Sequence, residues 1–215
     1  MMPIRPTRTR LEYLLVLDFE ATCGGEIPKS ESEIIEFPTL LYNLSTNSVQ
    51  AQFHEYVKPV GHPKLTEFCT ELTGIQQATV DAADTFPAVW ARFQEWLQSI
   101  GALEKPDNYA FLTCGDWDLK TMLPAQLAYT AKMQPGFSRA IPAPVDCWLN
   151  IKHSFSRHYN ITGRGRGMAG MLKYQKLQLE GRHHSGIDDC KNIARIVTKM
   201  RNQKWVPVDD LPKPT

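Results

Sequence analysis

Apolar runs separated by polar, turn-rich links occupy the first third of the chain. Residues 14–20 and 34–43 are apolar enough to form buried central strands. Residues 52–58 alternate between apolar and polar positions and stop at Pro59, which indicates a strand with one exposed face. Because the links between these segments are short, the pattern predicts an antiparallel meander.

Helical periodicity dominates the remainder. The clearest helix opens near Thr85, where Asp84 or Thr85 can cap it and Pro87 suits its first turn. Its apolar stripe comprises Phe86, Val89, Trp90, Phe93, Leu97 and Ile100. A short strand is expected at 109–113. Further helices are expected at 66–74, 118–129 (interrupted at Pro124), 145–159, 168–177 and 187–201. This order of elements predicts a mixed α/β fold.

Length and charge narrow the function classes. The 215 residues, 42% of them hydrophobic, suffice for a single core. We expect one domain at 11–204, between a flexible basic N-terminus (1–10) and an extended, proline-rich tail (205–215). The net charge of +1 argues against a passive electrostatic binder of nucleic acid, but not against an enzyme with a local cleft.

The cysteines and hydropathy predict an intracellular protein, cytoplasmic or nuclear. The five cysteines are widely spaced and none forms a Cys-x-x-Cys pair, so neither a zinc site nor a disulfide scaffold is indicated. No run approaches the roughly 18 apolar residues of a membrane span. Residues 1–10 lack the apolar centre of a secretory signal.

Acidic side chains recur beside the ends of predicted elements. Asp18 and Glu20 end the first apolar run, Asp118 follows the strand at 109–113, and Asp189 lies in the first turn of the last helix. At the carboxyl end of a strand, neighbouring carboxylates can converge on one metal ion. Taken separately, each is better explained as a solvated strand cap or as a charge favoured by a helix N-terminus than as a metal ligand.

Together with His184, these acids form a recognisable constellation. Asp-x-Glu, a distant aromatic-Asp and His-x4-Asp occur in the order that resembles the DEDDh family of 3′-to-5′ exonucleases. The motifs LVLDFEATC, EIIEFP, FCTELTGI, GDWD and HSGIDDCKN resemble its exoribonuclease branch. That branch contains the histone-mRNA 3′ exonuclease, the enhanced RNA interference exonucleases, and Snipper-like and prion-protein-interactor-like members. The resemblance runs from about residue 13 to 201.

The resemblance implies a fold, a reaction and a set of roles. The fold is a ribonuclease H-like mixed sheet, an antiparallel meander plus parallel strands, flanked by helices. The reaction removes nucleoside 5′-monophosphates from the 3′ end of single-stranded RNA or 3′ overhangs, and DNA can also serve as substrate. Two Mg²⁺ ions, which Mn²⁺ can replace, are held by Asp18, Glu20, Asp118 and Asp189. His184 takes the proton of the attacking water, which Glu20 helps to orient.

Two choices of register follow from the family pattern. His183 and Asp188 satisfy the His-x4-Asp spacing as well as His184 and Asp189 do. Because the family places its metal ligand second in the Asp-Asp pair, we choose His184 and Asp189. Likewise, Asp116 and Asp118 are both candidates for the metal ligand after the strand at 109–113. The family's aspartate follows the aromatic residue, so we choose Asp118. His183 also departs from the proline that relatives usually carry.

Substrate contacts are expected beside these ligands. Phe68, Leu72 and Trp117 match positions that pack or stack the terminal base, although core packing also explains Phe68 and Leu72. Backbone groups of Ala21 and Thr22 would lie beside the sugar, where a contact to the 2′-hydroxyl favours RNA. Glu20 and His184 complete the expected contacts.

Three questions stay open. The basic, glycine-rich loop at 157–167 is either a phosphate contact or a solvated loop. Glu36 either steers a ligand or gives structural support, and we interpret it as structural support. A catalytically silent module that binds RNA or protein, and a DNA-directed proofreading or repair exonuclease, are the alternatives to the exoribonuclease. Since about a dozen residues precede the nuclease core, we expect a minimal nuclease rather than a stem-loop-specific trimming enzyme.

Overall fold

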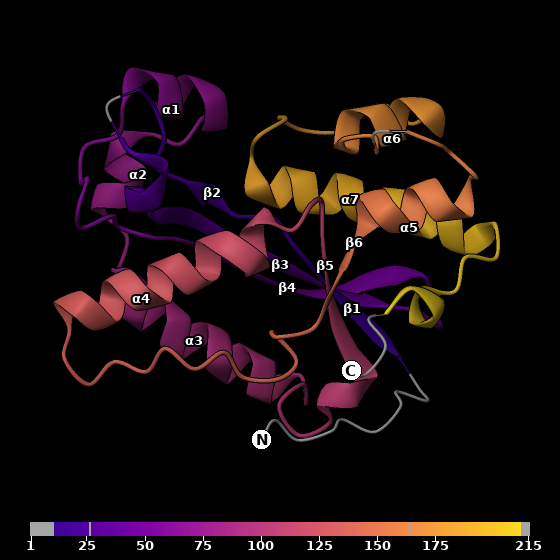
Figure 1. Cartoon of the computed structure of the whole chain (residues 1–215), viewed down its shortest axis with the longest axis horizontal. Helices are drawn as coiled ribbons and strands as arrows, with labels where there is room; N and C mark the ends of the chain where they lie inside the picture. Colours follow the sequence, from indigo (N-terminus) through magenta and orange to yellow (C-terminus); the bar gives the residue numbers. More distant parts are fainter. Residues whose placement is uncertain (1–10, 26, 164, 212–215) are drawn as a thin grey trace.

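A mixed six-stranded sheet forms the centre of the protein, in a computed structural model that describes residues 11–25, 27–163 and 165–211 (Figure 1). The strands are β1 (Tyr13–Leu17), β2 (Glu20–Ala21), β3 (Ile34–Asn43), β4 (Ser48–Tyr56), β5 (Tyr109–Thr113) and β6 (Trp148–Asn150). β4 pairs with one edge of β3, while β1 and then β2 pair with the other, all antiparallel. β5 and β6 follow as parallel strands beyond β1. The predicted meander and mixed sheet are confirmed, whereas the predicted basic N-terminus lies outside the described residues.

Helices cover both faces of this sheet (Figure 1). They are α1 (Glu67–Thr73), α2 (Gln77–Asp81), α3 (Phe86–Ser99), α4 (Leu123–Met133), α5 (Ile151–His158), α6 (Met168–Tyr174) and α7 (Gly186–Asn202). Alternation along β1 explains the two layers: Leu15 and Leu17 join the core under α3 and α4, while Leu14 and Val16 join the core under α5, α6 and α7.

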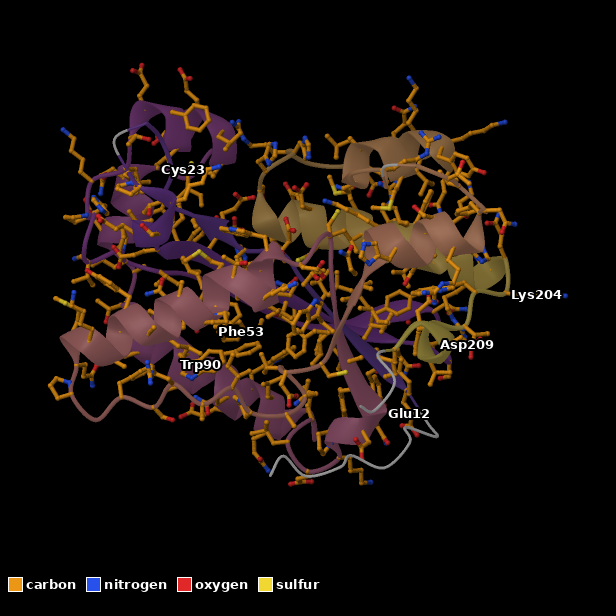
Figure 2. All side chains as sticks on the ribbon, in the orientation of Figure 1. Glu12, Cys23, Phe53, Trp90, Lys204 and Asp209 are labelled. Carbon is orange, nitrogen blue, oxygen red and sulfur yellow. The ribbon has the colours of Figure 1, made fainter. Side chains whose placement is uncertain are left out.

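Aromatic side chains fill the first of these cores (Figure 2). The rings of Phe37 and Phe93 lie 4.4 Å apart, and Phe53 meets Phe93 edge-on at 5.2 Å. Trp90 of α3 packs against the same cluster. Because this stripe was readable in the sequence, α3 is where periodicity alone predicted both the helix and its buried face.

The structure corrects three predicted elements. Residues 145–159 are not one helix, because residues 148–150 form β6 beside β5 before α5 begins. The helix expected at 118–129 is not interrupted at Pro124: it starts as a π-helix at Trp117–Met122 and continues as α4 to Met133. In place of an extended tail, Trp205 is buried and a short 3₁₀ helix covers Pro207–Asp210.

No helix in the described ranges has the length and apolar content needed to span a membrane.

Candidate active site

The parallel strands place the predicted acids at one edge of the sheet. Asp18 follows the last residue of β1, and Asp118 lies just beyond β5, in the π-helix. Because β1 and β5 are parallel, their carboxyl ends meet at the same edge. The backbone N–H of Phe19 donates to Asp118 Oδ1 at 2.9 Å, which joins the ends of the two strands directly. The π-helical turn presents Asp118 at this junction, a placement often found at functional sites.

Three carboxylates converge there. Ligand oxygens of Asp18, Glu20 and Asp189 all lie within 4.8 Å of one another. Glu20 begins β2 after the chain leaves β1, and its pairing with Glu36 is followed by a register shift, so the strand is irregular here. Asp189 arrives from the first turn of α7. The structure therefore brings together all four predicted ligands, with Asp118 hydrogen-bonded beside the cluster.

Burial and mutual repulsion disfavour the charged forms of these acids. Burial is the main cause in each case, and it raises the pKa of Asp18 far above its ordinary value. The pKa of Glu20 rises to about 9, and those of Asp118 and Asp189 rise to about 6. Negative charge from neighbouring acids adds to the effect at Asp18 and Glu20. A divalent cation is the natural compensation for so many buried carboxylates, and oxygen ligands suit a hard ion.

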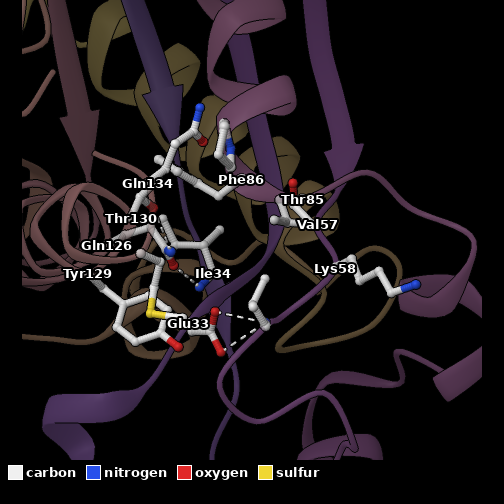
Figure 3. A pocket seen from close by; sticks show the side chains of 13 residues that line it. Glu33, Ile34, Val57, Lys58, Thr85, Phe86, Gln126, Tyr129, Thr130 and Gln134 are labelled. Carbon is white, nitrogen blue, oxygen red and sulfur yellow. Dashed lines mark hydrogen bonds between the residues drawn. The ribbon is translucent and has the colours of Figure 1, made fainter. Parts of the chain in front are cut away.

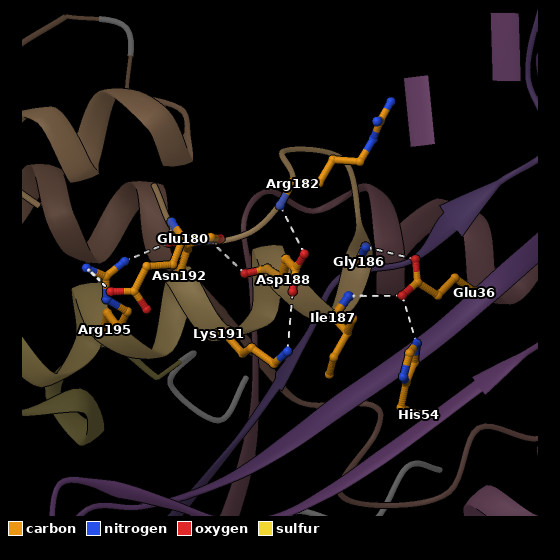
Figure 4. A network of polar contacts seen from close by, with 10 residues as sticks. All are labelled: Glu36, His54, Glu180, Arg182, Gly186, Ile187, Asp188, Lys191, Asn192 and Arg195. Atoms are coloured by element: carbon orange, nitrogen blue, oxygen red, sulfur yellow. Dashed lines mark hydrogen bonds and ion pairs between the residues drawn. The ribbon is translucent and has the colours of Figure 1, made fainter. Parts of the chain in front are cut away.

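A glycine and a glutamate hold the start of α7 against the sheet (Figure 4). A Cβ on Gly186 would lie 2.6 Å from the carbonyl oxygen of Asp18, so only glycine permits this approach. Glu36 of β3 accepts hydrogen bonds from the N–H groups of Gly186 (2.9 Å) and Ile187 (3.1 Å). His54 Nε2 contacts the same carboxylate at 2.8 Å. Glu36 is thus a helix clamp, as its predicted structural role implies, and it positions Asp189.

Replacing Glu36 with glutamine is expected to destabilise the protein by about 2 kcal/mol. Glutamine keeps one acceptor oxygen, but its NH2 group can only donate, so one of the two buried N–H groups that Glu36 binds loses its partner. Urea unfolding measures the difference. The matched control, Glu95→Gln on the exposed side of α3, should change stability by less than about 0.5 kcal/mol. Equal stability of the Glu36→Gln protein and the wild type would contradict the clamp.

His184 stands at the rim of the carboxylate cluster. Its backbone N–H donates to Asp189 Oδ2 at 3.1 Å, and the residue adopts a left-handed backbone with φ of 65°. Its pKa is lowered by burial first, and then by the charges of His183 and Arg182. The imidazole is therefore biased toward its neutral form, which has the lone pair that a proton acceptor needs. The alternative acid, Asp188, instead binds Lys191 and the N–H of Arg182.

Comparison with known proteins identifies the family. The family model described as Exonuclease, RNase_T, matches residues 15–197. The chain belongs to the exonuclease family. It is 45% identical over 206 residues to ERI1 exoribonuclease 3 of Mus musculus, covering 96% of this chain and 58% of that protein. It is 38% identical over 190 residues to 3′-5′ exoribonuclease 1 of Homo sapiens, covering 88% of this chain and 52% of that protein. The chain therefore spans little more than half the length of these curated relatives.

Solved structures of the exonuclease family share the fold. The nuclease domain of 3′hExo, a DEDDh family member solved bound to rAMP, has a TM-score of 0.81 at 33% identity, over 96% of this chain and 99% of that one. Cell-death related nuclease 4 has a TM-score of 0.78 at 30% identity, over 92% of this chain and 66% of that one. The resemblance stated from the sequence and the ribonuclease H-like α/β fold are both confirmed.

Two of the predicted substrate contacts are exposed aromatic side chains. Phe68 of α1 is 56% exposed and Trp117 is 46% exposed, so neither is a core residue. Leu72 is half-buried on the same helix as Phe68. Thr22 is fully buried, with its N–H donated to the Glu33 carbonyl and its hydroxyl accepting from the Glu33 N–H. The N–H and the hydroxyl oxygen of Thr22 thus have partners within the protein, and contact of this segment with a nucleotide stays a prediction.

Two cations near the carboxylates escaped the sequence analysis. Lys152 of α5 has its Nζ 3.4 Å from the position a Cβ on Gly115 would occupy, and its charge lowers the pKa of Asp118. Arg182 donates to the carbonyl of Glu71, which ties the His184 loop to α1. Neither residue lies in a recognisable motif, and both depend on contacts between distant segments. No local signal identifies them.

The structure describes every residue of the basic loop at 157–167 except Arg164. Arg166 lies 5.2 Å from the ring centre of Tyr174, and Arg157 forms an ion pair with Asp210. Both cations therefore already have protein partners. The role of this loop in holding RNA stays a prediction.

A separate pocket of about 260 Å³ lies between the start of β3 and the helices α3 and α4 (Figure 3). Gln126 Oε1 accepts the N–H of Ile34 at 2.8 Å on its wall. Glu33 accepts the N–H groups of Val60 (2.9 Å) and Gly61 (2.6 Å). None of the four predicted metal ligands lines this pocket. The contacts of Glu33 with this segment and with Thr22 brace the strand that carries Glu20.

Proposed function

We propose that this member of the exonuclease family hydrolyses RNA from the 3′ end and releases nucleoside 5′-monophosphates. The observation that carries the proposal is the convergence of Asp18, Glu20 and Asp189 within 4.8 Å, beside buried Asp118 and with His184 at the rim. All five positions of the family pattern are retained, which disfavours the catalytically silent binding module.

The four carboxylates would hold two Mg²⁺ ions, and Mn²⁺ could replace them. Bound there, such ions supply Lewis acidity at the phosphate and a water of lowered pKa. His184 accepts the proton of the attacking water through its neutral imidazole. Asp118 and Asp189 are fixed by the N–H groups of Phe19 and His184, so their oxygens are already oriented for an ion. Glu20 lies in the same cluster and orients the water.

The substrate proposed is single-stranded RNA or a 3′ overhang, with DNA as a second substrate. Relatives are named exoribonucleases, and one structurally similar 3′-exonuclease recognises a histone mRNA stem-loop at its 3′ end. In this chain, Phe68, Leu72 and Trp117 would pack against the terminal base. The segment Ala21–Thr22 and the side chains of Glu20 and His184 would face the terminal sugar and phosphate. The free thiols of Cys23, Cys69, Cys114 and Cys190 support the expected intracellular setting.

Replacing Trp117 with alanine is expected to raise KM for RNA about 10-fold. Loss of one stacking platform costs about 1–3 kcal/mol per base, and every base has a face to stack. Initial rates on RNAs that differ only in the 3′-terminal base measure the effect, which should be similar for all four. Met133→Ala, which removes another exposed apolar side chain outside the site, should leave KM unchanged. A KM unaffected by Trp117→Ala would remove this residue from the proposed binding surface.

The proposal is tested with matched RNA and DNA strands labelled at the 5′ end. With Mg²⁺, products should form a ladder that shortens from the 3′ end and should include 5′-monophosphates, while EDTA abolishes digestion. Faster digestion of RNA supports the exoribonuclease, and faster digestion of DNA supports the DNA-directed alternative. Intact strands after incubation with folded, metal-loaded protein would overturn the proposed function.

A further inference from the structure

Two consecutive histidines lie together beside the carboxylate cluster. The rings of His183 and His184 are stacked, with centres 4.0 Å apart and planes inclined by 21°. His183 Nε2 is 4.0 Å from Asp189 Oδ2. One ligand atom from each of His183, His184 and Asp189 falls within 4.8 Å of the other two. Nitrogen and oxygen donors of three side chains thus lie within reach of one another.

The backbone fixes this arrangement. Neighbouring side chains point in opposite directions along an extended chain, but the left-handed conformation of His184 turns both rings to one side. Arg182 and His184 donate their N–H groups to Asp188 (3.0 Å) and Asp189 (3.1 Å) of α7. Ser185 N–H closes the turn on the Arg182 carbonyl at 3.2 Å. The backbone of the histidine pair is therefore held in place by the start of α7. For both imidazoles to bind one ion, the half-exposed His183 side chain rotates out of the stack.

Asp189 retains unused hydrogen-bonding capacity. The residue is 4% exposed, and its Oδ1 has no hydrogen-bond partner among the described residues. A buried carboxylate oxygen without a partner is costly. By contrast, the side chain of His183 is 42% exposed, so an ion can reach the group from solvent.

The donor set differs in chemistry from the rest of the site. Asp18, Glu20 and Asp118 offer oxygen atoms alone, which suit Mg²⁺. Two imidazoles and one carboxylate instead match Zn²⁺ and related transition-metal ions, with a further position left for water. The two sets share Asp189, so they compete for its oxygens.

We propose that His183, His184 and Asp189 bind a transition-metal ion of the zinc class, and that this ion inhibits the nuclease. The inhibitory part rests on the proposed function. An ion at this site takes the lone pair that His184 needs to accept a proton, and it takes ligand capacity of Asp189 from the Mg²⁺ set. His183 belongs to the inhibitory site and to no step of the proposed reaction.

Binding is tested without reference to activity. Co²⁺, a spectroscopic substitute for Zn²⁺, is titrated into the full chain in excess Mg²⁺ while its visible absorption is recorded. The wild type should bind one Co²⁺ that Zn²⁺ displaces, and His183→Asn should bind it about 10- to 100-fold more weakly, since even an outer partner of a ligand is worth that much. His153→Asn, which removes an exposed histidine of α5, should bind as the wild type does. Equal Co²⁺ binding by the wild type and His183→Asn overturns the site.

Inhibition is tested on the same three proteins with RNA and excess Mg²⁺. The rate of each protein without Zn²⁺ serves as its own reference, because His183 lowers the pKa of His184 and its replacement changes that effect. His183→Asn should need about 10- to 100-fold more Zn²⁺ for half inhibition. If His183→Asn loses Co²⁺ binding but keeps the same sensitivity to Zn²⁺, the inhibitory role is wrong. If no protein digests RNA, the inhibitory role falls with the proposed function, while the Co²⁺ result still decides the site.

Discussion

Replacing Asp118 with asparagine is expected to slow RNA digestion about 10³-fold while making the metal-free protein more stable. Asparagine keeps an oxygen that can accept the Phe19 N–H, so the junction between β1 and β5 survives. It removes a charge from the metal site, where several kcal/mol of transition-state stabilisation is at stake, which corresponds to about 10³-fold in rate. It also removes the charge that, after burial, contributes most to the raised pKa of Asp18. Single-turnover rates and thermal unfolding in EDTA measure the two effects.

The control for Asp118 is its neighbour in the motif. Asp116 accepts a hydrogen bond from Trp148 Nε1 at 3.1 Å, and asparagine preserves that acceptor. Asp116→Asn should therefore keep its activity within about threefold, since it touches no predicted ligand. If Asp116→Asn loses activity and Asp118→Asn does not, the choice of register is wrong. Loss of stability in Asp118→Asn would contradict the account of repulsion among the carboxylates.

The metal-free protein is expected to lose stability as pH rises, and a divalent ion should restore it. Glu20 has a pKa of about 9 in the folded protein, against about 4.3 in an unfolded chain. Between these values the folded state binds more protons than the unfolded state, so the free energy of unfolding falls with increasing pH. The contribution is fully present below about pH 4 and is lost as pH rises through 9. Asp118 and Asp189, with pKa values of about 6, act in the same direction at lower pH.

Urea unfolding in EDTA at about pH 6 and about pH 9 checks this sign. We expect the free energy of unfolding to be lower at about pH 9 than at about pH 6, by an amount on the order of 3 kcal/mol. Glu20→Gln, which cannot ionise, should flatten the profile. Mg²⁺ or Mn²⁺ should stabilise the wild type more at the higher pH, because the ion binds the ionised carboxylates. A metal-free protein that gains stability toward pH 9 would contradict the proposed electrostatics of the site.

Sequence reasoning was most successful where one local pattern decides a structure. The apolar run of β3 and the stripe of α3 have no competing explanation, so both were predicted. β6 was missed because it is three residues long and exists only through pairing with β5, to which it is joined by a long connection. The π-helix at Asp118 was missed for a related reason. Pro124 suggests a break, yet the wider turn before it brings the Leu123 N–H to the Asp118 carbonyl, and the helix continues.

In the candidate site, too, residues that belong to a local motif were predicted, and residues placed only by tertiary packing were missed. Asp18, Glu20, Asp118 and Asp189 were predicted because their spacing forms a motif. Lys152 and Arg182 were not, since their relation to the site exists only after α5 and the His184 loop have packed. His183 was noted as a departure in sequence, but its stacking on His184 depends on a left-handed backbone that no residue type in the loop announces.

Counting bound Mn²⁺ by electron paramagnetic resonance tests the central claim most directly. The free ion is titrated against the wild type and against Asp18→Asn, with adenosine 5′-monophosphate present as a product. The account predicts saturable binding of about two ions per wild-type chain, and loss of at least one in Asp18→Asn. Absence of saturable binding, or equal binding by the two proteins, would contradict a metal centre built on these carboxylates.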